Sequence, residues 1–169
     1  MKSKLNLKLQ FANAGLVVAL SVAGAAAAQS LPKEGSYAYT ACWSGIANSI
    51  AFSKTHFAFS YEMTGTTRSD QPGSYGDNAS FRCVGMNASF AGKVRASATC
   101  EAIDSDGDKR LSYFSTGSDG ITAREQVTGT GKYEGMVSQT TVTPLGPFPV
   151  IKPGTFQNCN RQTGTYKLK

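Results

Sequence analysis

The sequence predicts an all-β protein: a single antiparallel barrel of about eight strands, preceded by a signal peptide. Three observations lead to this fold class. Short stretches alternate apolar and polar residues with a period of two, as strands with one buried face do. Glycine, asparagine, aspartate or proline separates these stretches at regular intervals, which is typical of sandwiches and barrels. Helix signals are almost absent after the first thirty residues.

The first thirty residues differ from the rest of the chain. Lysines precede an uncharged, apolar run that ends in small residues at Ala28. A basic start, a short apolar middle and a small-residue end describe a secretory signal peptide. We therefore expect a signal peptide at residues 1–28, a barrel domain at residues 29–169, and a periplasmic or secreted protein with no transmembrane span after cleavage. An uncleaved anchor is the alternative, but the run is short and alanine-rich for a span of about 20 strongly apolar residues.

The strand pattern is clearest in residues 36–43, 56–63 and 93–103. The residues expected to face inward are Tyr37, Tyr39, Ala41 and Trp43 in the first, Phe57, Phe59, Tyr61 and Met63 in the second, and Val94, Ala96, Ala98, Cys100 and Ala102 in the third. Further strands are expected at residues 46–52, 79–86, 109–116, 121–128, 133–143 and 155–168. A chain of this length suits a barrel of about eight strands, whose interior is filled by side chains or holds one small ligand.

Two segments do not fit the strand pattern. Residues 64–78 are polar and glycine-rich, and we expect a long mobile loop there. Residues 143–154 contain four of the six prolines, and proline cannot donate to the ladder of a central strand. The apolar residues of this second segment are expected to cap one end of the barrel or to line its mouth; they are Leu145, Phe148, Val150 and Ile151.

All four cysteines follow the signal peptide, and an even number in an exported chain favours disulfides. Three pairings are open on the count alone. A hairpin that turns at Ala91–Gly92 places Cys83 opposite Cys100, within reach of a disulfide. The first and last strands are neighbours in a closed barrel, which favours a second bridge between Cys42 and Cys159.

The charges do not indicate a nucleic-acid partner. The formal net charge of the full chain is +6, and the three lysines of the signal peptide account for half of it. The remaining basic residues are scattered, with no basic run interleaved with aromatics, so we expect no nucleic-acid binding.

Three aspartates alternate in the stretch C-E-A-I-D-S-D-G-D; they are Asp104, Asp106 and Asp108. An EF-hand loop needs glycine at its sixth position and glutamate at its twelfth, where this chain has Lys109 and Ser115. The Asp106–Gly107 dipeptide suits a two-residue hairpin turn, which is the interpretation we favour. A calcium ion bound by the three aspartates is the alternative, and no other cofactor is expected.

Two short segments resemble a known family. The stretch G-T-G-K-Y-E-G-M at residues 129–136 resembles the Gly-Thr-Gly-aromatic signature of the allene oxide cyclase and dirigent type of β-barrel. Together with the aspartate stretch at residues 100–108, it makes the chain look like small exported bacterial proteins with this calycin-like barrel. The resemblance implies an interior that binds a hydrophobic ligand or guides a radical coupling, as in the plant relatives. Their catalytic positions have no match in this chain, so no catalytic residue is assigned.

Three functions are compatible with these features. The first is a non-enzymatic exported barrel that binds a small hydrophobic molecule or a protein partner. The second is an isomerase or cyclase that acts in the cavity by positioning its substrate. The third is a periplasmic inhibitor or envelope-associated protein that uses residues 64–78 and 143–154 for contact. The candidate cavity residues are Tyr39, Trp43, Phe57, Phe59, Tyr61, Phe81 and Tyr113. A hollow interior would favour the first two functions.

Overall fold

The computed structural model describes residues 31–146 and 148–169. The predicted signal peptide lies outside the described residues. No helix within the described part of the chain is long and apolar enough to cross a membrane.

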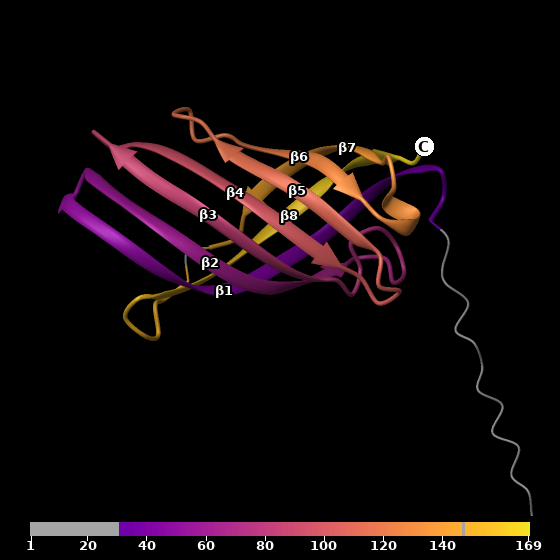
Figure 1. Ribbon diagram of the computed structural model, residues 1–169, viewed down its shortest axis with the longest axis horizontal. Coiled ribbons are helices and arrows are strands. Elements are labelled where there is room, and N and C mark those ends of the chain that lie inside the picture. Colours follow the sequence, from indigo (N-terminus) through magenta and orange to yellow (C-terminus); the bar gives the residue numbers. More distant parts are fainter. Residues whose placement is uncertain (1–30, 147) are drawn as a thin grey trace, which may run out of the picture.

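Eight antiparallel strands and one short 3-10 helix make up the described chain (Figure 1). They are β1 (Glu34–Ser53), β2 (His56–Ser69), β3 (Ser80–Phe90), β4 (Lys93–Ile103), β5 (Lys109–Thr116), β6 (Thr122–Gly129), η1 (Gly131–Tyr133), β7 (Val137–Pro144) and β8 (Thr155–Lys167). The predicted all-β fold class with about eight strands is confirmed. Residues 36–52, expected as two strands, form the single long strand β1.

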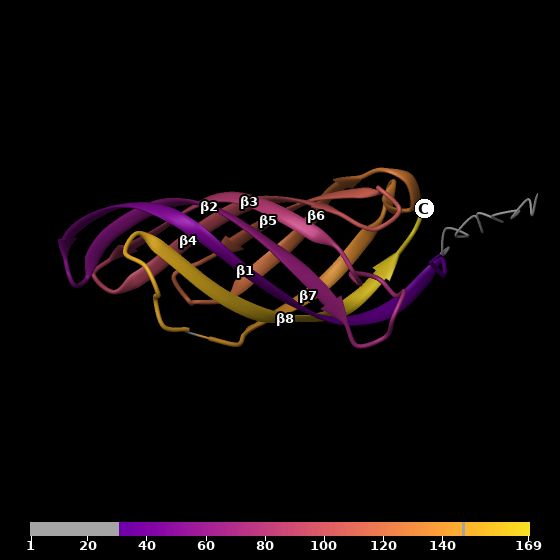
Figure 2. The same cartoon turned by 90° about the horizontal axis from the view of Figure 1, so that it is seen from below.

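The strands form one sheet in the order β6-β5-β4-β3-β2-β1-β8-β7, which curls into a nearly closed barrel (Figure 2). As expected, the first and last strands pair with each other. The edges that meet are those of β6 and β7, which share no backbone ladder in the described sheet. Arg124 of β6 crosses this gap and donates a 3.4 Å hydrogen bond from Nη1 to Oγ1 of Thr140 on β7.

The inner face follows the predicted alternation in β1, β2 and β4. In β1, Tyr37, Tyr39 and Ala41 are buried, and in β4 the same holds for Ala98 and Cys100. Alternate residues of a strand point to opposite faces of the sheet, so this pattern sets which side chains reach the interior.

Both predicted disulfides are present, Cys42–Cys159 and Cys83–Cys100. Each joins residues that lie directly opposite each other on paired strands. The Cys83–Cys100 bridge is buried in the interior, whereas Cys42 is exposed on the outer face. Disulfides persist in oxidising compartments, so the two bridges indicate an extracytoplasmic environment.

The prediction of a long loop at residues 64–78 is wrong in two respects. Residues 64–69 extend β2, because they pair with β1 and, in part, with β3. The remaining loop folds back into the barrel, and its Tyr75 is only 1% exposed. The Thr67 hydroxyl donates a 2.6 Å hydrogen bond to the carbonyl of Gly76, whose φ of +81° suits glycine, and this fixes the loop against the sheet.

The apolar side chains of residues 143–154 lie outside the core. Leu145, Phe148, Val150 and Ile151 are all exposed and none of them lines the interior cavity, so they do not close the end of the barrel; that they line its mouth stays a prediction. The loop runs beside the end of β1, where the backbone N–H of Ala47 donates a 3.0 Å hydrogen bond to the carbonyl of Gly154. This contact fixes the end of the loop beside β1.

Candidate ligand cavity

The barrel interior contains a cavity of about 400 Å³ to which all eight strands contribute. This volume lies in the range of small-molecule sites, which is roughly 300–1,000 Å³. The cavity exists because β4 turns small side chains inward: Ala96, Ala98 and Ala102 line it together with the Cys83–Cys100 bridge. Opposite larger residues, such small side chains leave the centre of the barrel unfilled.

Four of the seven predicted cavity residues line this space: Tyr39, Trp43, Tyr61 and Phe81. The rings of Trp43 and Phe81 meet edge to face, with centroids 6.4 Å apart. Gly85 makes room for the neighbouring Tyr61, because a Cβ at this glycine would lie 2.6 Å from the tyrosine ring. These aromatic side chains make the walls of the cavity mainly apolar.

The other three predicted residues do not line the cavity. Phe57 and Phe59 stack on each other, with centroids 6.5 Å apart, next to the turn between β1 and β2. Tyr113 lies on the outer face and is 39% exposed. Its neighbour Phe114 lines the cavity instead, because β5 turns its even-numbered residues inward.

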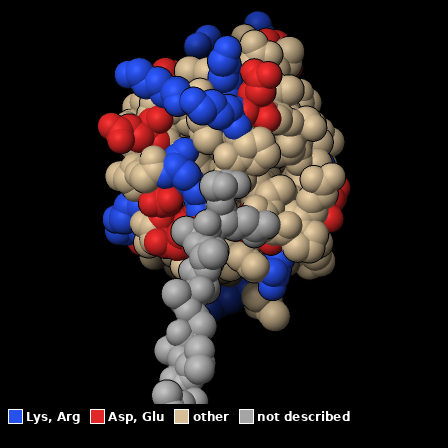
Figure 3. Space-filling model, turned by 90° about the vertical axis from the view of Figure 1, so that its right-hand side faces the viewer, with Lys and Arg blue, Asp and Glu red and all other residues tan. Residues whose placement is uncertain are grey.

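A cluster of five tyrosines closes the barrel at the end where the C-terminus lies. We call it the tyrosine cluster; its members are Tyr37, Tyr39, Tyr75, Tyr133 and Tyr166. Tyr75 is at its centre, with its ring centroid 4.5 Å from that of Tyr37 and 5.4 Å from that of Tyr166. The outer surface at this end carries Lys, Arg, Asp and Glu side by side (Figure 3).

Two arginines lie between the tyrosine cluster and the cavity, and both line the cavity. Arg110 of β5 is 3% exposed. Its guanidinium carbon lies 4.5 Å from the ring centroid of Tyr75 and 5.0 Å from that of Tyr133. Its Nη1 atom is buried and has no hydrogen-bond partner among the described residues.

Arg124 of β6 is the second arginine. Its Nη2 atom donates hydrogen bonds to the hydroxyls of Ser112 at 2.9 Å and Tyr75 at 3.0 Å, and to Oε1 of Gln126 at 3.2 Å. Neither Arg110 nor Arg124 forms an ion pair with an Asp or Glu of the described chain. We call the end of the cavity formed by Arg110 and Arg124 its floor. With two guanidinium groups and no carboxylate of the described chain, the floor is strongly positive.

Burial raises the pKa values of the neighbouring tyrosine hydroxyls, and the positive charges of the two arginines lower them. Burial raises the pKa of Tyr39 to about 12, against a smaller lowering effect of Arg124. Burial also acts to raise the pKa of Tyr75, but the charges of Arg110 and Arg124 outweigh it, so this pKa lies below its ordinary value. Tyr75 is thus the phenol of the cluster best placed to lose its proton.

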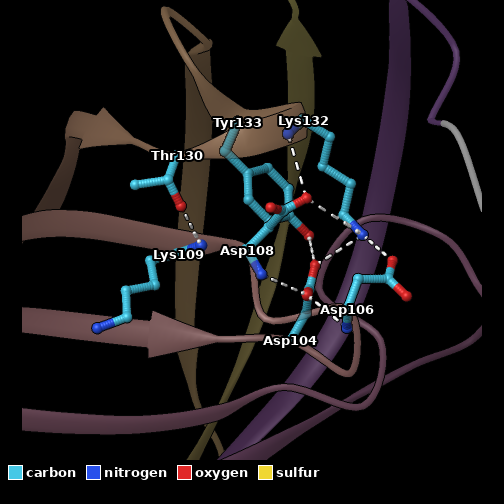
Figure 4. Close-up of polar contacts among 7 residues, drawn as sticks. All are labelled: Asp104, Asp106, Asp108, Lys109, Thr130, Lys132 and Tyr133. Carbon is cyan, nitrogen blue, oxygen red and sulfur yellow. Dashed lines mark hydrogen bonds and ion pairs between the residues drawn. The ribbon is translucent and has the colours of Figure 1, made fainter. Parts of the chain in front are cut away.

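No known protein family, curated protein or solved structure matches this chain. The resemblance to the allene oxide cyclase and dirigent type of barrel therefore stays a prediction. The structure does bring together the two segments on which that resemblance depends, residues 100–108 and 129–136 (Figure 4).

The three aspartates of the first segment surround Lys132 of the second (Figure 4). Lys132 Nζ lies 2.8 Å from Oδ2 of Asp104, contacts Asp106, and is 4.0 Å from Oδ2 of Asp108. The Tyr133 hydroxyl also donates a 2.8 Å hydrogen bond to Asp104. We call this group the aspartate–lysine cluster.

Asp104 is the centre of the aspartate–lysine cluster, and its side chain is only 5% exposed. Its Oδ1 atom accepts hydrogen bonds from the backbone N–H groups of Asp106 at 2.9 Å and Asp108 at 3.1 Å, which holds the turn between β4 and β5 together. A turn is present as predicted, but it spans residues 104–108 and is not a two-residue turn on Asp106–Gly107. The N–H of Gly107 donates to the carbonyl of Asp104, and of the two residues only Gly107 has a positive φ. Burial acts to raise the pKa of Asp104, but the hydrogen bonds from Lys132 and Tyr133 outweigh it and lower that pKa.

These contacts describe a structural use of the three aspartates. An ammonium group occupies the position between the carboxylates that a bound cation would share. Among residues 31–146 and 148–169, no group of three or more His, Cys, Asp or Glu side chains is arranged to hold a metal ion. Calcium binding by the three aspartates, the alternative to a purely structural turn, stays untested.

Proposed function

We propose that this chain is an exported barrel protein that binds one small, mainly apolar molecule in its interior. The observation that supports this proposal is the cavity of about 400 Å³, with apolar walls around Trp43 and Phe81 and a smaller number of polar side chains, among them two arginines. Ligand sites commonly combine an apolar lining with a few polar groups that fix orientation. The two disulfides agree with an exported protein.

The alternative of an isomerase or cyclase has less support from the residues that line the cavity. Its described lining contains no Asp, Glu, His or Lys side chain; the ionisable groups are Tyr39, Tyr61, Arg110 and Arg124. A reaction that needs a carboxylate or imidazole base has no such group here. Cyclisation by positioning alone needs none, and it remains the second interpretation of the same cavity.

Native mass spectrometry with a neutral apolar probe, N-phenyl-1-naphthylamine, tests the binding proposal. We expect one probe molecule per protein chain. In Ala98→Phe, a ring added to the cavity wall should abolish binding. The matched control, Ala123→Phe, adds the same ring on the exposed outer face of β6 and should bind like the wild type. Absence of a complex with the wild-type protein, or equal binding by both variants, would refute an interior site.

Association with the membrane of the cell envelope is a second candidate function, and a specific surface feature favours it. Four strand connections lie at the end of the barrel opposite the tyrosine cluster (Figure 1). Exposed apolar residues lie in these connections or in the strand ends next to them: Phe52, Phe90, Ile121 and Ile151. Ile151 is 89% exposed. Three exposed lysines (Lys54, Lys93 and Lys152) lie close to these residues in the chain, against one acidic residue, Asp119, in the connection from β5 to β6. Apolar tips flanked by lysines suit an anionic lipid surface.

Sedimentation with lipid vesicles tests this second function. We expect the protein to sediment with phosphatidylglycerol vesicles and not with phosphatidylcholine vesicles. The double variant Phe52→Ser/Ile151→Ser should lose this binding, whereas Val127→Ser/Val137→Ser, which changes two exposed valines elsewhere, should keep it. Equal sedimentation of both double variants would contradict a role for the apolar tips.

A further inference from the structure

We propose that the floor of the cavity binds an oxyanion, so that the ligand is an amphipathic molecule with a carboxylate, sulfonate or phosphate group on an apolar body. This inference rests on the proposed binding function and specifies the chemical class of the ligand. Arg110 and Arg124 would hold the anionic group, and the aromatic walls would cover the apolar part.

The first argument is the unbalanced charge of the floor. Two guanidinium groups face the interior, and the described chain provides no carboxylate to either of them. Proteins rarely bury a charge without an opposite charge, because removing an ion from water has a large free-energy cost. Arg110, at 3% exposure and with an unpartnered Nη1, is the clearest case.

The second argument is that the neighbouring groups only partly compensate these charges. The faces of Tyr75 and Tyr133 stabilise the Arg110 guanidinium through cation–π contacts at 4.5 and 5.0 Å. The hydroxyls of Ser112 and Tyr75 accept hydrogen bonds from Arg124. In their neutral forms these groups hold the arginines in place and add no negative charge, so an anion brought by a ligand would complete the site.

The third argument is the arrangement of the cavity around the two arginines. Arginine presents a planar set of N–H donors that matches the paired oxygens of carboxylates and phosphates. Gln162, also buried, lines the same floor next to Tyr39, whose hydroxyl donates a 2.6 Å hydrogen bond to Oε1 of Gln162. The apolar side chains of Trp43, Phe81 and Phe114 line the same cavity. A ligand with an anionic head and an apolar body is complementary to both parts.

A pair of ligands that differ only in the head group tests this inference. Decanoate and decan-1-ol have the same chain length, and each is titrated as a competitor of bound N-phenyl-1-naphthylamine. We expect decanoate to bind about tenfold or more tightly than decan-1-ol, since hydrogen bonds to charged groups are the stronger ones. Equal affinities of the two competitors would overturn the anion site while leaving the binding proposal intact.

Substitutions of Arg110 locate the effect. Arg110→Met keeps most of the side-chain length without the charge, so the affinities for decanoate and decan-1-ol should approach each other to within about twofold. Arg110→Lys keeps the charge but loses the planar set of donors, so its preference for decanoate should be weaker than that of the wild type but still present. Arg95→Met is the matched control, because it removes the same charge from an exposed residue of β4 that does not line the cavity. Its preference for decanoate should equal that of the wild type.

The outcomes separate the two proposals. Failure of the wild-type protein to bind N-phenyl-1-naphthylamine would refute the binding function and the anion site together. Bound probe with an undiminished decanoate preference in Arg110→Met would refute only the anion site. If Arg110→Met does not fold, as judged by loss of the β-sheet circular dichroism signal, the comparison of Arg110→Lys with Arg95→Met decides. A preference for decanoate that is weaker in Arg110→Lys than in Arg95→Met supports the site, and identical preferences contradict it.

Discussion

Arg124 donates a 3.0 Å hydrogen bond from Nη2 to the hydroxyl of Tyr75, and so links the open edge of the barrel to the loop that closes its end. The same arginine reaches Thr140 across the gap between β6 and β7. One side chain therefore contacts the loop that carries Tyr75, lines the cavity and reaches the edge strand β7. This central position explains why the charge of Arg124 influences the phenols around it.

Tyr75 should be the first buried tyrosine of the cluster to ionise. Its pKa is lowered by Arg110 and Arg124 against the effect of burial, whereas the pKa of Tyr39 is raised to about 12. Absorbance at 295 nm, recorded against pH for the wild type and for Tyr75→Phe, measures this directly. The wild type should show a phenolate signal below pH 10 that Tyr75→Phe lacks; superimposed curves below that pH would contradict the prediction.

The sign of the linked stability change follows from this shift. A folded-state pKa below the unfolded value means that ionisation of Tyr75 adds stability to what its packing provides, and this added part is present at alkaline pH and is lost as pH falls through the folded pKa. Tyr75→Phe should therefore change the free energy of unfolding by a larger amount at alkaline pH than at pH 7. Chemical denaturation at the two pH values tests this difference.

The aspartate–lysine cluster should contribute strongly to stability. Lys132→Met leaves the Asp104 carboxylate, which is 5% exposed, without its cation, and we expect a loss of about 3 kcal/mol in the free energy of unfolding. Lys109→Met is the matched control, because it breaks an exposed pair with Glu101 and should cost about 0.5 kcal/mol or less. Urea denaturation compares the two; equal losses would contradict a special role for the cluster.

Acid should destabilise the protein through the same cluster. The pKa of Asp104 is lowered in the folded state, so its stabilising effect is present above the unfolded pKa and is lost as pH falls through the folded pKa. Asp104→Asn should therefore be less stable than the wild type at pH 7, and the difference should shrink in acid. A difference that stays constant between pH 7 and pH 2 would show that ionisation of Asp104 is not its cause.

Calcium should not bind the three aspartates while Lys132 is present. The ammonium group already lies among the carboxylates of Asp104, Asp106 and Asp108, and a divalent cation would have to displace it. We expect millimolar calcium to leave the thermal unfolding temperature unchanged. A clear upward shift that is lost in Asp106→Asn would support the calcium site instead.

The outer disulfide should stabilise the barrel mainly through the unfolded chain. The Cys42–Cys159 bridge joins residues 117 positions apart, and a loop of that size corresponds to roughly 4–5 kcal/mol in the chain-entropy description. Cys42→Ala/Cys159→Ala should lose a large part of this amount in the free energy of unfolding, because exposed Cys42 adds little packing. A loss below about 1 kcal/mol would contradict this account.

Much of the fold could be predicted because its determinants are local or follow from register. Alternation in residues 36–43, 56–63 and 93–103 identified the inner faces of β1, β2 and β4 correctly. Both disulfides followed from hairpin symmetry and from the pairing of the first and last strands. Cysteines that lie opposite each other in two paired strands are close enough to bond.

The sequence pattern did not identify Arg110 as a cavity residue, because residues 110–113 of β5 turn polar side chains inward and larger apolar side chains outward. Its outward residues include Leu111 and Tyr113, while Arg110 and Ser112 are buried. The register with β4 sets this choice: Arg110 lies opposite Ala102 and therefore shares its inner face. The clear pattern of β4, carried across the turn at residues 104–108, was the signal that could have identified Arg110 as an interior residue.

The burial of Tyr75 and the exposure of residues 145–154 could not be predicted from alternation, because neither segment is a regular strand. A single tyrosine in a polar, glycine-rich segment has no periodicity, and its burial depends on contacts with distant parts of the chain: Tyr37 of β1, Tyr133 of η1 and Tyr166 of β8. The apolar side chains of the loop have no alternation either, so the pattern gave no sign that they are exposed beside β1, where the loop backbone contacts Ala47.

The central claim is that a small apolar molecule enters the cavity, and Trp43 allows the most direct measurement. It is the only tryptophan of the chain and it lines the cavity. Bromine quenches indole fluorescence on contact, so 10-bromodecan-1-ol is titrated into the protein with decan-1-ol as the control. We predict saturable quenching of Trp43 by the brominated alcohol only, with no quenching in Ala98→Phe. An interior binding site would be contradicted if Trp43 emission stayed undiminished up to the solubility limit of 10-bromodecan-1-ol. Equal quenching in Ala98→Phe would contradict it as well.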